Sequence, residues 1–230
     1  MELLYKSWDS NFFGKEIYDV LIDNDDLTHG LTIPTKREAM LQANVSISEY
    51  LKTTFLLREG FDWVSTTICF RKTLTPITGK RVMLLKASKD DINEVRRFLP
   101  GMYKHSRFFC DKYYPADAAD RLYDEWVVKS YDGSYDDGIL VYKENDRVGG
   151  FVTYRKNLTF LRIGLFGVNP EFQGKGLGSK IIDSLEGMCA SSAIKEIQVD
   201  TQQLNNSAVK IYVRNGYDIC DIRPWMYKRV

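Results

Sequence analysis

The chain has 230 residues, enough for one large domain or two small ones, and 44% of them are hydrophobic. Its 32 basic and 31 acidic residues give a net charge of +1 without a long basic run, which argues against a nucleic-acid-binding protein. No apolar run is long enough to span a bilayer, and four separated cysteines with two histidines lack the spacing of a zinc site, so we expect no membrane span, no metal and a cytoplasmic protein with free thiols.

The N-terminal part of the chain carries a pattern that recurs near its C-terminal end. We expect a strand at 45–48, then a helix over Phe55 that Gly60 ends, and a new strand from Phe61. The same succession is expected around Ile211–Gly216 and Tyr217. We interpret the N-terminal part as a degenerate half-copy of the C-terminal fold. Coincidence is the alternative, because helix–glycine–strand junctions are common.

Proline and glycine between Leu74 and Lys80 indicate a boundary. We therefore divide the chain into a small α/β domain at 1–78 and a larger domain at 79–230. The larger one should begin with a strand over Arg81–Lys86, followed by a helix that opens with a capping box at Ser88–Asp91.

Hydrophobic periodicity gives the remaining elements of the larger domain. A second helix should start near Pro115, where proline suits the first turn. After it we expect, in order, a hairpin of Gly138–Lys143 with Val148–Arg155, a strand over Leu158–Val168, a helix over Lys175–Ala190, a strand over Ile194–Asp200, a helix containing Tyr212, and a strand from Tyr217 to Ile222. The predicted order is β-α-α-β-β-β-α-β-α-β.

The segment Val168–Gly178 joins a predicted strand to a predicted helix and contains Gly174, Gly176 and Gly178. Glycines at such a turn let bare backbone approach an anion, and a helix N-terminus attracts negative charge. The segment lacks the Gly-Lys-Ser/Thr of a nucleotide-triphosphate loop, and its G-x-G-x-G spacing differs from the dinucleotide fingerprint. An unknown phosphate-bearing ligand is therefore expected here, with an ordinary strand–helix turn as the alternative.

The pattern V-x-P-x-x-Q-x-x-G-x-G in this segment resembles the pyrophosphate loop of the GCN5-related N-acetyltransferase (GNAT) superfamily. The resemblance implies that acetyl-CoA binds at this loop. It also implies the GNAT fold, an α/β (α+β) architecture whose mixed sheet splays two central parallel strands. The residues implied to contact the cofactor are Val168, Gln173, Gly174, Lys175, Gly176, Leu177 and Gly178.

A second segment, from Asn205 to Tyr217, resembles the later GNAT motif N-x-x-A-x-x-x-Y-x-x-x-G-[FY]. Asn205 can cap the helix, and Tyr212 lies at helical spacing with its apolar residues. The resemblance implies that Asn205 contacts the cofactor and that Tyr212 protonates the departing coenzyme A thiolate. A core aromatic is the alternative role for Tyr212.

Two further segments, Trp8–Gly14 and His105–Phe108, resemble bacterial N-acetyltransferases that make dTDP-fucosamine derivatives. This implies acetyl transfer to a nucleotide-linked amino sugar, such as a dTDP-4-amino-4,6-dideoxyhexose, for surface polysaccharide synthesis. His105, Arg107 and Tyr114 are the candidate substrate residues, and Arg107 could pair with phosphate oxygens. A peptide N-terminal acetyltransferase and a non-catalytic acyl-CoA-binding module are the alternatives. Aromatic surface stretches make a homodimer reasonable.

The reaction needs a base, an oxyanion donor and an acid for the thiolate. A backbone N–H near Val168 is the expected oxyanion donor. The strand Leu158–Val168 contains no carboxylate, so ordered water or His105 is the expected base.

Overall fold

The computed structural model describes residues 2–24, 27, 38–75, 81–111, 114–115 and 117–230. Its strands are β1 (Glu2–Tyr5), β2 (Glu16–Leu21), β3 (Ala39–Asn44), β4 (Asp62–Thr73), β5 (Leu84–Lys86), β6 (Gly138–Glu144), β7 (Arg147–Lys156), β8 (Phe160–Val168), β9 (Glu196–Gln202) and β10 (Asp218–Arg229). Its helices are α1 (Ser7–Phe13), α2 (Tyr50–Arg58), α3 (Lys89–Phe98), α4 (Arg107–Cys110), α5 (Ala118–Asp132), the 3₁₀ helix η2 (Pro170–Phe172), α6 (Leu177–Ala190) and α7 (Asn206–Arg214).

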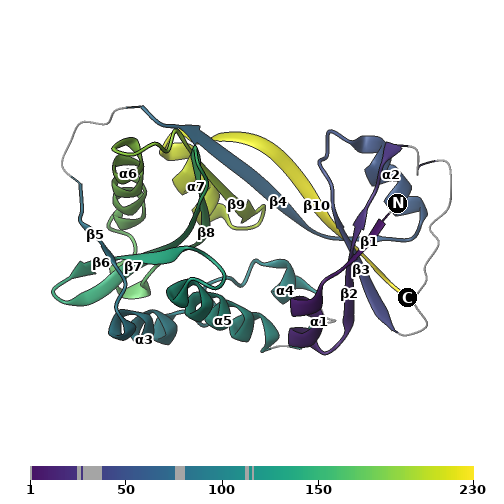
Figure 1. Ribbon diagram of the computed structural model, residues 1–230, viewed down its shortest axis with the longest axis horizontal. Coiled ribbons are helices and arrows are strands. Elements are labelled where there is room, and N and C mark those ends of the chain that lie inside the picture. The colour runs from purple at the N-terminus through teal and green to yellow at the C-terminus, as the bar shows by residue number, and fades with distance from the viewer. Residues whose placement is uncertain (1, 25–26, 28–37, 76–80, 112–113, 116) are drawn as a thin grey trace.

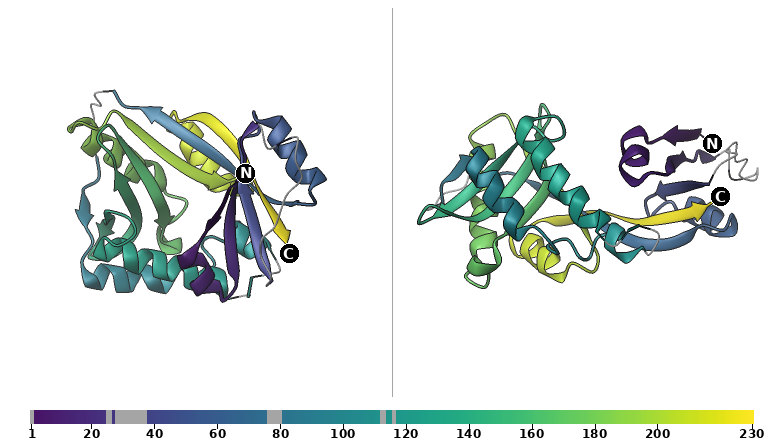
Figure 2. Two further views of the ribbon diagram at one scale, coloured as in Figure 1. Left: turned by 45° about the vertical axis from the view of Figure 1, so that its right-hand side comes forward. Right: turned by 90° about the horizontal axis from the view of Figure 1, so that it is seen from below.

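The strands of the described residues form one mixed ten-stranded sheet, in the order β1-β2-β3-β10-β4-β9-β8-β7-β6-β5. The long strands β4 and β10 pair antiparallel at its middle and run from one half of the molecule to the other (Figures 1 and 2). β4 pairs with β9 on its other side, and β10 pairs with β3. β4, which follows α2, therefore pairs with a strand of the C-terminal half, and β10, which follows α7, pairs with a strand of the N-terminal half.

The two helix–strand junctions are built alike. Gly60 ends α2 at φ +82°, and Gly216 ends α7 at φ +76°. After each glycine, an aromatic N–H donates back to the last turn, from Phe61 to the Leu56 carbonyl and from Tyr217 to the Tyr212 carbonyl, both at 3.0 Å. These contacts confirm the predicted helix–glycine–strand junctions. We propose that β3-α2-β4 and β9-α7-β10 are equivalent half-units that exchange their last strands.

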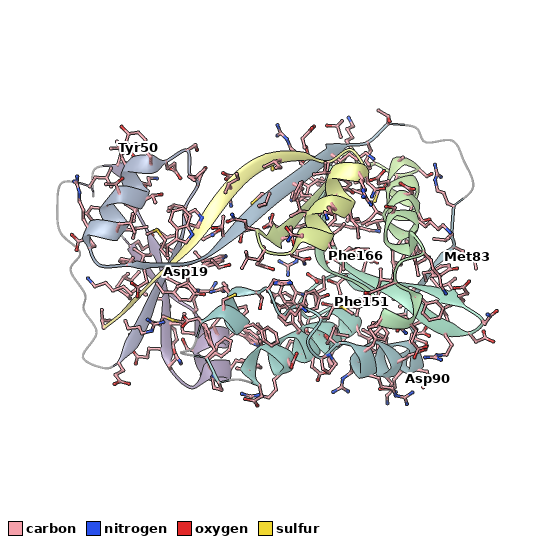
Figure 3. The ribbon with its side chains drawn as sticks, turned by 180° about the vertical axis from the view of Figure 1, so that it is seen from behind. Asp19, Tyr50, Met83, Asp90, Phe151 and Phe166 are labelled. Carbon is pink, nitrogen blue, oxygen red and sulfur yellow. The ribbon has the colours of Figure 1, made fainter. Side chains whose placement is uncertain are left out.

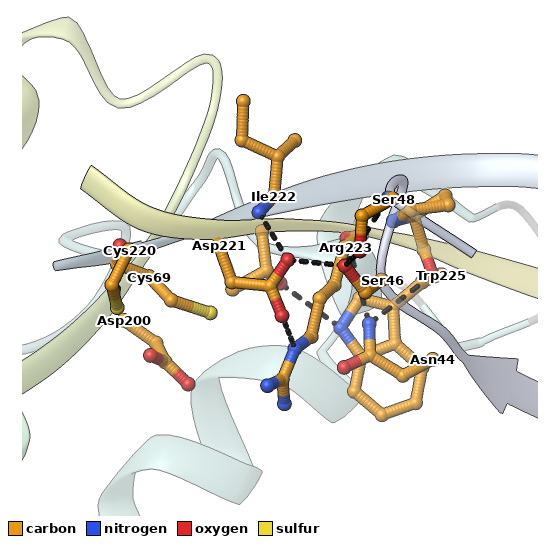
Figure 4. Close-up of polar contacts among 12 residues, drawn as sticks. Asn44, Ser46, Ser48, Cys69, Asp200, Cys220, Asp221, Ile222, Arg223 and Trp225 are labelled. Carbon is orange, nitrogen blue, oxygen red and sulfur yellow. Dashed lines mark hydrogen bonds and ion pairs between the residues drawn. The ribbon is translucent and has the colours of Figure 1, made fainter. Parts of the chain in front are cut away.

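The predicted strand at 45–48 is wrong, because the strand lies earlier, at Ala39–Asn44. The side chain of Ser46 donates to Asp221 Oδ1 at 2.6 Å, and the Ser48 N–H donates to Ser46 Oγ at 3.2 Å (Figure 4). These serine contacts form a turn that leads into α2 in place of a strand. Our proposed boundary between residues 78 and 79 lies outside the described residues.

From residue 84 onward, the predicted succession of elements is confirmed, with the short α4 in addition. The final strand is longer than predicted, since β10 continues through Pro224. α6 and α7 cover one face of the sheet, over a core that includes Phe70, Ile181 and Tyr212. α3 and α5 cover the other face, over a core that includes Val95 and Phe151. None of the described helices is long and apolar enough to cross a membrane.

The parallel strands β8 and β9 separate along their length, as the predicted fold requires. They pair from Phe160–Glu196 as far as Ile163–Val199, whereas β8 continues to Val168 and β9 to Gln202. β8 also carries an extra residue at this point, because Val152 pairs with Phe166 while Tyr154 pairs with Ile163. This β-bulge bends β8 and opens a gap in the sheet.

Asp91 closes the predicted capping box at the start of α3. Its Oδ2 accepts from the Ser88 N–H at 2.9 Å, its own N–H donates to Ser88 Oγ at 3.2 Å, and Lys143 Nζ lies 2.9 Å from Oδ1. Burial alone would raise the pKa of Asp91, but the hydrogen bonds from Ser88 and Lys143 lower it below its ordinary value. A lowered folded-state pKa means that the carboxylate stabilises the fold above its unfolded pKa, and that this stabilisation is lost as pH falls through the folded pKa.

We therefore expect Asp91→Asn to lower the free energy of unfolding by about 1–2 kcal/mol at pH 7 and by less near pH 2–3. Urea denaturation at both pH values measures this. Asp90→Asn, which changes the exposed neighbour, is the matched control. An Asp91→Asn effect that does not change with pH would show that the charge of this carboxylate contributes nothing.

Candidate active site

The loop between β8 and α6 is held by its own polar side chains. Asn169 is buried, donates from Nδ2 to the Val148 carbonyl at 3.0 Å, and accepts from the Glu171 N–H at 3.1 Å. Gln173 Nε2 donates to the Val168 carbonyl at 2.9 Å, which folds the loop back on the end of β8. The Asn169 and Gln173 side chains therefore shape the turn, and the Gln173 side chain binds the protein backbone.

The glycines of this loop have two different roles. Gly174 and Gly176 have φ of +79° and +73°, and a Cβ at either position would meet no atom within 4 Å. Gly178 has another reason to be glycine, because its Cβ would lie 2.9 Å from Ile211 Cδ1 on α7. Gly178 thus lets α6 pack closely on α7, and Gly174 and Gly176 allow the turn itself.

The N-terminus of α6 can receive an anion. Its first intrahelical bond runs from the Lys180 N–H to the Gly176 carbonyl, and no side chain within the described ranges caps the helix. The preceding N–H groups of the first turn therefore point out of the helix. Lys175 is exposed beside them, while Leu177 is buried in the core. Binding of the acetyl-CoA pyrophosphate here stays a prediction, which the unpaired N–H groups and Lys175 support.

The gap beside β8 exposes backbone amides. The Asn169 N–H donates to the Gly149 carbonyl, and the Leu165 N–H donates to Thr153 Oγ1, both toward β7. Because N–H groups alternate in direction along a strand, those of Phe166 and Val168 point to the gap. The Phe166 carbonyl, which also faces the gap, accepts from the Tyr103 hydroxyl at 3.3 Å. The sequence reasoning identified the Val168 amide but missed Phe166.

A cavity of about 1010 Å³ opens at this gap. Phe166 on β8 and Asp19 on β2 both line it, so residues from both halves of the molecule contribute (Figure 3). Its charged lining residues are Lys6, Asp9, Asp19, Arg107, Lys129, Asp136, Arg155, Arg162 and Asp200, and its tryptophans and tyrosines are Trp8, Trp126, Trp225, Tyr5, Tyr103, Tyr123, Tyr135 and Tyr212. The volume is in the range of small-molecule sites.

Tyr212 and Asn205 of α7 line the same cavity. Only 3% of Tyr212 is exposed, and its ring packs against that of Phe70, with centroids 5.4 Å apart. Burial, and then the negative charge of Asp200, raise the pKa of Tyr212 well above its ordinary value. Asn205 caps α7, accepting from the Ala208 N–H at 3.1 Å. Tyr212 is thus a core aromatic that also lines the cavity, and its role as the acid for the thiolate stays a prediction.

Arg107 is a cation of the cavity that both aromatic rings and hydrogen bonds hold in place. Its guanidinium carbon lies 3.8 Å from the ring centroid of Trp225 and 4.2 Å from that of Phe108. Its Nη1 donates to Gln42 Oε1 at 2.8 Å and to the Tyr227 hydroxyl. Within the described part of the chain these are its only hydrogen bonds, so Nε and Nη2 remain available to a ligand in the cavity.

The other two substrate candidates lie elsewhere. Tyr114 is 5% exposed and packs in a cluster with Phe13 and Phe108. His105 is half-buried, and neither it nor Tyr114 is among the described residues that line the cavity. The described residues also contain no group of three or more His, Cys, Asp or Glu placed to hold a metal ion.

Comparison with known proteins agrees with this geometry. The model of the acetyltransferase (GNAT) family matches residues 99–217, more than half of the chain. A dTDP-fucosamine acetyltransferase from Escherichia coli O6:H1 is 25% identical, over 96% of both chains. The spore coat polysaccharide biosynthesis protein SpsD of Bacillus subtilis is 26% identical over 50% of this chain and 39% of its own.

A crystal structure of a GCN5-related N-acetyltransferase from Sphaerobacter thermophilus superposes with a TM-score of 0.61 at 13% identity, over 85% of this chain and 61% of that one. At this identity the likeness supports the fold alone. The family match adds the reaction, since it spans the loop at Gly174–Gly178 and the helix that carries Tyr212. The chain therefore belongs to the GNAT acetyltransferase family and is an acetyl-CoA-dependent N-acetyltransferase.

Proposed function

We propose that this enzyme transfers the acetyl group of acetyl-CoA to the amino group of a nucleotide-linked amino sugar in the cytoplasm, for bacterial surface polysaccharide synthesis. The acceptor we favour is a dTDP-4-amino-4,6-dideoxyhexose. The observation that carries the proposal is the cavity, which Arg107 lines beside Gln42 of β3. The similarity to a dTDP-fucosamine acetyltransferase along nearly the whole chain adds support.

The cavity suits a sugar nucleotide in three respects. Its volume exceeds what a simple amine needs. Arg107 offers a rigid guanidinium to a diphosphate, the anion that such a fork binds best. Tryptophan and tyrosine rings in the wall offer flat faces to a base and a sugar. A peptide would need an open groove, whereas Trp8 of α1 and Asp19 of β2 add walls to this cavity from the N-terminal half.

In the proposed reaction, the neutral amine attacks the thioester carbonyl in the gap beside β8. The gap-facing N–H groups of Phe166 and Val168 stabilise the oxyanion that develops on the carbonyl oxygen. Tyr212 then protonates the sulfur as the C–S bond breaks. The phenol is protonated at neutral pH, and the burial that raises the pKa of Tyr212 also raises the proton affinity of a thiolate that departs beside it.

Release of coenzyme A thiol tests the proposal. Acetyl-CoA is supplied with dTDP-4-amino-4,6-dideoxygalactose, its gluco epimer, polyamines or a peptide pool, each separately, and product masses are determined. We expect turnover with one sugar epimer and a product heavier by one acetyl group. Turnover with peptides or polyamines alone would retain the acetyltransferase but refute the sugar-nucleotide acceptor.

A further inference from the structure

A buried carboxylate lies in the cavity wall next to the gap. Asp136, in the loop between α5 and β6, is 3% exposed and lines the cavity. Its Oδ2 accepts three hydrogen bonds from uncharged donors, from Trp126 Nε1 at 2.9 Å, Ser130 Oγ at 3.1 Å and Thr153 Oγ1 at 2.6 Å. Burial of a carboxylate costs folding free energy through desolvation, which suggests that Asp136 is kept at this position for a function.

Strand β8 is shaped around this carboxylate. A Cβ at Gly164 would lie 2.4 Å from Asp136 Oδ2 and 2.7 Å from Thr153 Oγ1, so only glycine fits there. The β-bulge places Gly164 and Leu165 opposite Thr153. The Thr153 hydroxyl donates to Asp136 and accepts from the Leu165 N–H at 2.7 Å. The same irregularity that opens the gap therefore admits the Asp136 carboxylate to β8, a strand with no carboxylate of its own.

Two of the other three acidic residues of the cavity, Asp19 and Asp200, are engaged in closer charge pairs, and the third, Asp9, belongs to α1. Asp19 lies 3.2 Å from Lys6 Nζ and accepts from Gln42 Nε2 at 2.7 Å. Asp200 forms an ion pair with Arg162. For Asp136, the nearest cation is Arg155, whose Nη2 is 3.4 Å from Oδ1, beyond hydrogen-bond geometry. That guanidinium instead donates to the Tyr135 carbonyl. Among the described residues Oδ1 accepts no hydrogen bond and takes part only in the ion pair with Arg155, so it is the carboxylate oxygen that can accept from a new donor.

We propose that Asp136 Oδ1 binds the amino group of the acceptor and takes its proton before attack. Gly164, beside the carboxylate, precedes Phe166 by two residues, which span at most about 6.6 Å because the β-bulge shortens the strand here. This length fits one hydrogen bond from Oδ1 to the amine plus the approach of about 3 Å between amine and carbonyl that attack requires. The proposal rests on N-acetyl transfer itself and holds for any amine acceptor.

Protons and bonds balance in this scheme. One N–H bond of the ammonium breaks and an O–H bond forms on Asp136, which leaves a neutral amine. The amine nitrogen then bonds to the acetyl carbon, the C–S bond breaks, and Tyr212 supplies the thiol proton. The excess proton on the new amide nitrogen returns to Tyr212, and Asp136 gives its proton to solvent. Asp136 is therefore a catalytic residue, and Thr153 and Gly164 are positioning residues.

Asp136→Asn is the decisive variant, because an amide can keep its oxygen at the Oδ2 position while it removes the charge at Oδ1. With the acceptor that the panel above identifies, we expect kcat/KM for the amine to fall about 10²–10³-fold, with acetyl-CoA affinity within about twofold. Asp137→Asn is the matched control, since this neighbour is exposed and its carboxylate accepts a hydrogen bond from the Lys156 N–H at 2.6 Å. It should retain wild-type kinetics. Thermal unfolding reports whether each variant folds.

The wild-type protein provides a second test that needs no variant. The acceptor and its analogue with hydroxyl in place of the amine compete for the site, and their inhibition or dissociation constants are compared. We expect the amine to bind at least about tenfold more tightly, since only it donates a charged hydrogen bond. Equal binding of the two, or unchanged kcat/KM in folded Asp136→Asn, would overturn the role of Asp136 while leaving the identity of the acceptor to the turnover panel.

Discussion

Replacing Tyr212 by Phe is expected to lower kcat by about 10²–10³-fold, the usual effect of losing a general acid. The ring stays in its core position against Phe70, so the fold and the acetyl-CoA site should persist. Only the hydroxyl that protonates the sulfur is lost. Stopped-flow or steady-state thiol release gives kcat, and calorimetry gives the dissociation constant of acetyl-CoA, which should change by less than about twofold.

Tyr142→Phe is the control for this experiment. Tyr142 packs against the same core cluster as Tyr212, but among the described residues it is not one that lines the cavity. Its loss of a hydroxyl should leave kcat unchanged. If Tyr212→Phe also retained its turnover number, the thiolate would not receive its proton from Tyr212, and Tyr212 would be a packing residue only.

The second large effect is expected at Arg107. Arg107→Met keeps a long side chain between Phe108 and Trp225 but removes the donors that would face a diphosphate. Charge-assisted hydrogen bonds contribute about 1.5–3 kcal/mol each, so kcat/KM for the sugar nucleotide should fall about 10²-fold or more. Arg107→Lys should recover only part of this loss, because an ammonium cannot reproduce the planar fork.

Several measurements separate binding from folding in the Arg107 variants. The affinity for acetyl-CoA should be unchanged, because the α6 N-terminus lies outside the Arg107 environment. Arg97→Met, on the exposed face of α3, should behave as wild type. A fall in melting temperature that accounts for the lost activity would show that Arg107 serves to stabilise the fold through Gln42 and Tyr227. A loss confined to acetyl-CoA binding would contradict our placement of the diphosphate.

The C-terminal elements were predictable because short-range signals specify them. Glycine at positive φ, asparagine as a helix cap and alternating hydrophobic residues lie within a few positions of what they determine. The loop at Gly174–Gly178 and the α7 helix are examples, and both follow the prediction. Sequence reasoning overlooked that Gly178 packs against Ile211, since this contact depends on a second helix.

Long-range pairing set the limit of prediction. The pairing of β4 with β9 and of β10 with β3 has no local signal, and a proline such as Pro224 is unusual inside a central strand. The strand at Ala39–Asn44 was placed too late, because alternating Val-Ser-Ile-Ser reads as a strand unless the partner of Ser46 is known. Asp136 was missed for the same reason. It lies in a polar, glycine-containing turn, and its place against β8 depends on the space left by Gly164, far away in the sequence.

The central claim is that one cavity holds the nucleotide diphosphate at Arg107 and the acceptor amine at the gap beside Phe166. A crystal structure with coenzyme A and dTDP-4-amino-4,6-dideoxygalactose measures this most directly. We predict diphosphate oxygens within hydrogen-bond distance of Arg107, the coenzyme A pyrophosphate at the N-terminus of α6, and the amine beside Asp136. A sugar nucleotide bound outside this cavity, or bound with its amine directed away from the gap, would contradict the account.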